Sequence, residues 1–222
     1  MIQSGKFDSF NMNIKKLTNS VTVFIINRLI ETFGFIISIL GILLLISLIS
    51  YSPSDPNFIF PENTEIKNFL GFRGSYISDL FFQSVGLIAY LVPITYIFTG
   101  INIFRKKEFF LFISNSFYIV IYLLIGSLFF GLFYKNAFDL YINGNGGFVG
   151  TYLSQTFLQN ILNFNNNFSY FLILIIIILI FLLSVNFSYK NFTSFLKKLS
   201  KIFFGDKSKN YTDKNEIINE YI

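Results

Sequence analysis

The sequence predicts an all-α integral membrane protein in which four transmembrane helices form a bundle, with both termini in the cytoplasm. Three observations favour this class. Apolar residues make up 53% of the 222-residue chain and charged residues only 13%, whereas a soluble domain carries about 25% charged residues. Four long apolar stretches contain no charged side chain. Lysine and arginine also concentrate in alternate segments between these stretches, which is typical of membrane proteins.

The first span is predicted at about 29–51. Residues 33–50 contain no charge, amide or proline, and a helix of that length nearly crosses the roughly 30 Å hydrocarbon layer. Tyr51 suits the headgroup level, and Pro53 cannot continue the helix. The earlier apolar run at 21–26 is either an interfacial turn or an extension of the same helix. A cleaved signal peptide is not expected, because the main apolar run starts late and no small-residue cleavage site follows it.

The second span is predicted at about 79–104 and the third at about 109–134. Only residues 105–108 connect them, so these two helices are expected to be antiparallel neighbours. We expect Pro93 to kink the second span, because proline removes a backbone donor and clashes with the preceding turn.

The connection after the third span is predicted to contain an amphipathic helix. Apolar residues recur there at three- and four-residue spacing from Val149 to Phe164, opposite a polar face. Such a helix is expected on the membrane surface or against the bundle. The fourth span is predicted at about 168–189, and the basic tail at 190–222 resembles the start of a linker.

Basic residues predict which side of the membrane each segment occupies. Fourteen lie in the cytoplasmic N-terminal segment 1–28, the turn 105–108 and the tail. Three lie in the two long connections, namely Lys67, Arg73 and Lys135. The positive-inside rule therefore predicts that the termini face the cytoplasm and the long connections face outward.

The spans carry few polar groups. No aspartate, glutamate, lysine or arginine lies in the four apolar stretches 33–50, 80–104, 109–134 and 168–185. This weighs against transport coupled to protons or ions, which normally needs ionisable groups in the bundle.

Two kinds of helix contact are expected inside the bundle. Asn102 and Asn115 are predicted to hydrogen-bond between helices. Small residues four apart allow helices to approach closely, and two such pairs are Gly34 with Ser38 and Ser127 with Gly131.

The sequence offers little for catalysis. Histidine and cysteine are absent, which removes the usual general base and the common metal ligands. No Gly-x-x-x-x-Gly-Lys-Ser/Thr sequence occurs, so we expect no ATP hydrolysis by this chain alone, and the glycines at 143–147 are interpreted as a turn. No catalytic, cofactor or metal residue is expected.

Two other functions are alternatives. The first is a small polytopic channel or transporter subunit, which the uncharged spans disfavour. The second is a membrane enzyme acting on lipid. Its only candidate groups are the acidic residues of the first long connection, namely Asp55, Glu62, Glu65 and Asp79.

Four stretches of the chain together carry a family resemblance. They are Ser-Pro-Ser-Asp-Pro at 52–56, the segment from Asn68 to Asp79, the segment from Phe82 to Pro93, and Gly-Gly-Phe-Val-Gly at 146–150. In their order and topological places, over about residues 28–190, they resemble the four-span N-terminal domain of the FtsK/SpoIIIE family of bacterial DNA translocases.

The resemblance implies a multi-pass anchor in the bacterial inner membrane, targeted to the division septum. It implies self-association as a hexamer, contacts with other division proteins, and a role in cell division and chromosome segregation. DNA would be moved by a C-terminal ATP-dependent motor that this chain does not contain, so the chain is expected to be a fragment or a domain encoded alone.

Twelve residues of the matched stretches are expected to shape loops and helix junctions, with partner contact as a second interpretation. They are Pro53, Asp55, Pro56, Gly71, Gly74, Asp79, Gly86, Tyr90, Pro93, Gly146, Gly147 and Gly150.

Overall fold

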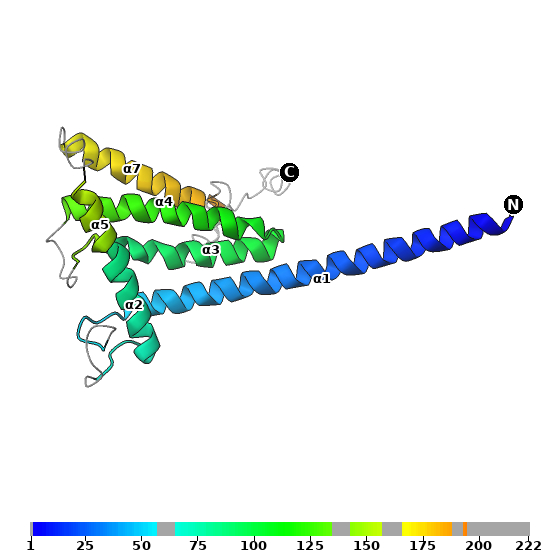
Figure 1. Ribbon diagram of the computed structural model, residues 1–222, viewed down its shortest axis with the longest axis horizontal. Coiled ribbons are helices and arrows are strands. Elements are labelled where there is room, and N and C mark those ends of the chain that lie inside the picture. Colours follow the sequence, from blue (N-terminus) through cyan, green and yellow to red (C-terminus); the bar gives the residue numbers. More distant parts are fainter. Residues whose placement is uncertain (1, 57–64, 135–142, 157–165, 188–192, 195–222) are drawn as a thin grey trace, which may run out of the picture. The chain divides into compact units, whose positions relative to one another are not determined.

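The computed structural model describes residues 2–56, 65–134, 143–156, 166–187 and 193–194. Residues Met1–Asn186 form one unit and Phe187–Ile222 a second, and the fold below is that of the first unit. Its described elements are all helical (Figure 1). They are α1 (Ile2–Ile49), α2 (Gly71–Val85), the 3₁₀ helix η1 (Gly86–Tyr90), α3 (Leu91–Lys106), α4 (Phe110–Phe133), α5 (Gly147–Ser154) and α7 (Asn166–Ser184).

Four helical segments are long and apolar enough to cross a membrane, which confirms the predicted all-α, four-span class. They are Thr18–Ile49, Gly71–Lys106, Phe110–Phe133 and Asn166–Ser184. A helical backbone satisfies its own hydrogen bonds, and lipid offers no other partners.

The first span is part of one continuous helix. α1 is helical through residues 21–26, so this run is an extension of the first helix and not a separate interfacial turn. The helix ends at Ile49, and the following Ser-Pro-Ser-Asp segment forms a turn in which the Asp55 N–H donates to the Ser52 carbonyl at 3.1 Å. Pro53 lies in this turn, where its fixed φ is tolerated.

The second span is interrupted, but not at the predicted position. α2 ends at Val85, Gly86 has φ +72°, and η1 follows before α3 begins at Leu91. Pro93 lies in the first turn of α3, where backbone donors lack intrahelical partners and proline is tolerated. The prediction of a kink at Pro93 was therefore wrong, because the break falls at Gly86, where glycine readily adopts positive φ.

Small residues bring α1 close to α3. A Cβ added to Gly34 would lie 2.7 Å from the Gly100 carbonyl oxygen. The Ser38 hydroxyl donates to the Ile97 carbonyl at 3.2 Å. The predicted Gly34 and Ser38 pair thus lies in a helix contact, as small residues do in membrane bundles.

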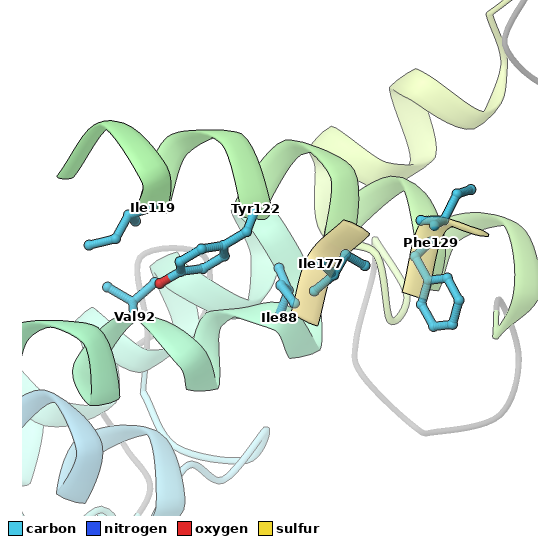
Figure 2. Packing of buried hydrophobic residues seen from close by; sticks show 7 residues of the cluster. Ile88, Val92, Ile119, Tyr122, Phe129 and Ile177 are labelled. Carbon is cyan, nitrogen blue, oxygen red and sulfur yellow. The ribbon is translucent and has the colours of Figure 1, made fainter. Parts of the chain in front are cut away.

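An apolar core joins η1, α3, α4 and α7, and Figure 2 labels six of its side chains. They are Ile88, Val92, Ile119, Tyr122, Phe129 and Ile177. The Tyr122 hydroxyl lies 3.1 Å from the Thr95 hydroxyl, so the one polar atom of this cluster has a partner.

Asparagines join the helices near the α3–α4 turn, as predicted. The Asn115 amide donates to the Thr99 hydroxyl at 2.8 Å, and the Asn186 amide donates to the Asn115 side-chain oxygen at 3.0 Å. Asn102 donates to the Val185 carbonyl at 3.3 Å. Hydrogen bonds of this kind stabilise contacts between helices in lipid.

The helix expected between the third and fourth spans is described only in part. α5 covers Gly147–Ser154, whereas the positions predicted at 157–164 lie outside the described residues. α5 packs on α4 through its glycines, and Tyr152 of the predicted apolar face is 63% exposed.

Candidate functional site at the loop end of the bundle

The polar residues singled out in the sequence gather where α1 ends, α2 begins and α5 packs on α4. We call this region the loop end; it comprises residues 47–56, 65–90 and 143–154. The geometry there has three parts: a carboxylate held by backbone amides, an asparagine between two helices, and a junction of glycines.

Asp55 joins the turn after α1 to the segment before α2. Its carboxylate is 1% exposed and accepts the N–H groups of Lys67 at 3.0 Å and Asn68 at 2.9 Å. Charge-assisted bonds of this kind are about twice as strong as neutral ones. Asp55 thus acts as a positioning group that fixes two loop segments. Pro56 beside it is buried, and its carbonyl accepts the Ser75 hydroxyl at 2.9 Å.

Asn68 connects α1 to α2 and was not among the predicted site residues. It is 5% exposed, and its amide donates to the Ser47 carbonyl at 2.9 Å. Its side-chain oxygen accepts the Leu70 N–H at 3.1 Å, an Asx turn that leads into α2. Ser47 in turn donates to the Gly74 carbonyl at 2.6 Å. An asparagine shortly before a glycine-started helix was the available sequence signal.

Asp79 belongs to a separate hydrogen-bonded pair. It is 5% exposed, and the Tyr51 hydroxyl donates to its carboxylate at 3.2 Å. Of the other acidic residues considered for lipid chemistry, Glu65 is exposed and Glu62 lies outside the described residues. Among the described residues, no three acidic side chains come together as a metal site. Both buried carboxylates therefore serve to hold backbone and hydroxyl donors.

Glycines allow α4, α5 and the α2–η1 break to meet. A Cβ on Gly150 would lie 2.1 Å from the Ser127 carbonyl oxygen, and one on Gly86 would lie 2.0 Å from the Asn145 carbonyl oxygen. The Leu87 N–H donates to that same Asn145 oxygen at 2.9 Å. Gly147, at φ +61°, packs against the backbone of residues 84–86, where α2 ends and η1 begins. The structure thus brings predicted residues from two distant stretches together.

The remaining predicted residues have different surroundings. Gly71 starts α2 at φ +66°, and a Cβ there would meet nothing within 4 Å. Gly146 packs against α4 backbone, and the Gly74 position is closed by the Asn68 side chain. The Tyr90 hydroxyl donates to the Leu48 carbonyl at 3.3 Å.

A charged group marks the opposite end of the same helices. Glu31 of α1 accepts the Lys107 ammonium at 3.1 Å and also pairs with Arg28. Lys107 follows α3 in the left-handed conformation, at φ +61°. We call Arg28, Glu31 and 105–107 the basic end.

Residues 27–197 match the family described as the 4TM region of DNA translocase FtsK/SpoIIIE. The chain belongs to this family. The resemblance found in the sequence is therefore confirmed, and the matched region is the family's membrane region and not its motor.

Relatives described as DNA translocase FtsK show the same similarity. The protein of Rickettsia bellii is 27% identical over 167 residues, which cover 75% of this chain and 21% of the relative. The protein of Shewanella oneidensis is 31% identical over 137 residues, which cover 60% of this chain and 15% of the relative. The protein of Rickettsia typhi is 31% identical over 130 residues, which cover 59% and 17%. This chain thus spans about a fifth or less of these relatives.

No solved structure matches the chain. Membership of the FtsK/SpoIIIE 4TM family and four candidate spans make this chain a multi-pass inner-membrane domain.

Proposed function

We propose that this chain anchors a DNA translocase in the inner membrane and directs it to the division septum. It would thereby act in cell division and chromosome segregation. The observation that carries the proposal is the match to the FtsK/SpoIIIE 4TM region over residues 27–197. An anchor needs rigid spans and defined ends, and the buried polar contacts of the bundle supply both.

Both termini are proposed to be cytoplasmic. The basic end carries Arg28, Arg105, Lys106 and Lys107, whereas the described loop end carries Lys67 and Arg73 beside Asp55 and Asp79. An excess of Lys and Arg near span ends favours the cytoplasmic side. A motor joined to the C-terminal side of this domain would then share a compartment with the chromosome.

The loop end is proposed to contact other division proteins. Asp55 and Asn68 hold the two loop segments in place, so that nearby exposed side chains have fixed positions. Phe69 is 79% exposed, and Phe148 and Tyr152 stack on α5 with ring centroids 6.3 Å apart. Pre-positioned aromatic side chains are favourable for binding because little entropy is lost on contact.

Self-association is the remaining part of the proposal. The family resemblance supports a hexamer, in which several anchors would gather around one motor ring. Native mass spectrometry of the protein in lipid nanodiscs tests this state, and a purely monomeric spectrum at micromolar concentration would count against it.

The septal role is tested with a fluorescent protein fused after Ile222, in the bacterium that encodes the chain. We expect a fluorescent band at midcell in dividing cells. The matched variants are Phe148→Ser and Tyr152→Ser, which remove exposed rings without touching the buried contacts and are expected to weaken the band. A wild-type fusion spread evenly around the envelope would contradict septal targeting.

A further inference from the structure

The exposed and buried faces of α2 are inverted relative to a helix of a soluble protein. The residues that α2 buries are mostly small or polar, namely Gly74, Ser75, Ser78, Asp79 and Phe82. The side chains it exposes are Phe72, Arg73, Tyr76, Ile77 and Leu80. Apolar exposure of this extent, from 36% at Tyr76 to 55% at Leu80, is unfavourable in water.

α2 is not needed to complete the second span. A straight helix over the 36 residues of Gly71–Lys106 would measure about 54 Å, far more than the roughly 30 Å hydrocarbon layer. η1 and α3 alone, at about 2.0 and 1.5 Å per residue, extend about 34 Å. The span from Gly86 to Lys106 therefore crosses the layer without α2.

Contacts with α1 define the direction of α2. Gly74 accepts the Ser47 hydroxyl, Asp79 accepts the Tyr51 hydroxyl, and the Phe82 ring lies 4.7 Å from the Tyr51 ring. From Gly74 to Phe82, α2 advances about 12 Å, whereas residues 47–51, at and just beyond the end of α1, cover about 6 Å. α2 thus runs across the end of the first span and not alongside it, as Figure 1 shows.

The depth of α2 follows from the same contacts. Residues 47–51 are the last three residues of α1 and the two that follow it, at the end of the apolar run, and this is where a span reaches the headgroups. Ile49, the last residue of α1, is 64% exposed. The apolar face of α2 is therefore continuous with the lipid-facing surface of the first span.

The charge of the exposed face favours phospholipid as its partner. Arg73 is the one charged side chain on that face of α2, while Asp79 is turned inward. Aromatic and aliphatic residues with a cation at their edge are typical of helices that lie in the headgroup region. Arginine can also bind phosphate oxygens bidentately.

We propose that α2 is an interfacial helix. It lies flat in the headgroup region of the leaflet at the loop end, with Phe72, Tyr76, Ile77 and Leu80 inserted among lipids and Arg73 on lipid phosphate. The polar contacts of Asn68 and Asp79 hold it to the bundle from the other side. This role concerns lipid contact and depends on neither septal targeting nor the orientation of the termini.

Fluorescence quenching in proteoliposomes tests this placement, because the chain has no native cysteine. The full chain carries an environment-sensitive dye on Phe72→Cys, Ile77→Cys or Leu80→Cys, in vesicles of phosphatidylethanolamine and phosphatidylglycerol. Spin-labelled lipids with the quencher in the headgroup or deep in the acyl chain report the depth of each dye. Phe98→Cys, at an exposed position in the middle of α3, and Glu65→Cys, in the loop, serve as deep and aqueous controls.

At all three α2 positions, we expect the headgroup quencher to reduce dye fluorescence at least twofold more strongly than the acyl-chain quencher. Three results would each overturn the proposal. Depth increasing steadily from Phe72→Cys to Leu80→Cys would make α2 part of a crossing helix. Strong quenching by aqueous iodide would place the face in water, and protection from both iodide and lipid quenchers would place it against protein, including a second copy. Circular dichroism of each labelled protein checks that its helix content is unchanged.

A charge variant tests the contact with phosphate separately. With the dye at Phe72→Cys, Arg73→Glu is expected to raise quenching by acrylamide, a neutral aqueous quencher, about twofold, whereas Arg73→Lys is expected to leave it unchanged. Equal quenching in the Arg73→Glu variant and its parent would contradict the proposed contact between Arg73 and lipid phosphate.

Discussion

At the scale of single residues, buried polar side chains take the place of missing backbone partners at the loop end. Asp55 satisfies two backbone N–H groups, and Asn68 satisfies the Ser47 carbonyl at the end of α1. Removing one member of a buried hydrogen-bonded pair leaves the other unsatisfied, which costs about 1–3 kcal/mol. These residues therefore contribute to stability and, through it, to the shape of the loops.

Asn68→Ala is expected to lower the free energy of unfolding by about 1–3 kcal/mol, because the Ser47 carbonyl and the Leu70 N–H lose their partner. Phe69→Ala is the matched control, since that neighbouring side chain is 79% exposed, and it is expected to change stability by less than about 0.5 kcal/mol. Denaturant unfolding of the purified protein in detergent measures both. Equal losses in the two variants would contradict the proposed role of Asn68.

Gly150→Ala is expected to destabilise the protein more than Gly71→Ala. A Cβ on Gly150 would lie 2.1 Å from the Ser127 carbonyl oxygen, so α4 and α5 must separate. At Gly71 the space is open and only the positive φ is unfavourable, at about 1–2 kcal/mol. Thermal unfolding in detergent ranks the two. A Gly71→Ala protein that melts below Gly150→Ala would contradict the described α4–α5 contact.

At the scale of elements, the four spans were predictable from the sequence. The interruption of the second span at Gly86 was not. In lipid a long apolar segment must be helical to satisfy its own backbone, so composition alone locates it. Gly86 and Pro93 both interrupt helices in principle. What distinguishes them is the Asn145 carbonyl, which reaches the break from the segment after α4 and binds the Leu87 N–H. A contact between such distant segments leaves no local pattern in the sequence.

The candidate site at the loop end was also only partly predictable from the sequence. Glycine at 86, 147 and 150 could be expected to shape turns, because it tolerates positive φ and close backbone contact. That Gly147 would meet the α2–η1 break and Gly150 would meet α4 could not be expected. Asn68 was missed because a lone asparagine in a polar loop looks like any solvated residue until its burial is known.

Gly34→Leu tests the contact between α1 and α3. The Gly34 position lies against the backbone of Gly100 and Phe104, so a large side chain must push the helices apart. Overpacking of this kind is expected to cost about 1–3 kcal/mol of unfolding free energy or more. Phe35→Leu changes the next, 58% exposed residue and is expected to be nearly neutral. Similar unfolding midpoints for the two variants would contradict close packing of α1 on α3.

At the scale of the whole molecule, the two ends of the bundle differ in chemistry. The loop end buries carboxylates and asparagine among backbone amides, while the basic end presents Arg28, Arg105, Lys106 and Lys107 around Glu31. Apolar helices of the FtsK/SpoIIIE 4TM family connect the two ends. An asymmetry of this kind orients a membrane protein during insertion, and the proposed anchor depends on that orientation.

The most direct test is cysteine labelling of the cysteine-free chain in spheroplasts. Glu65→Cys reports on the loop end and Lys106→Cys on the basic end, and both positions are exposed. We predict that a membrane-impermeant maleimide labels Glu65→Cys in intact spheroplasts, and labels Lys106→Cys only after the membrane is permeabilised. Labelling of Lys106→Cys but not Glu65→Cys in intact spheroplasts would contradict the account.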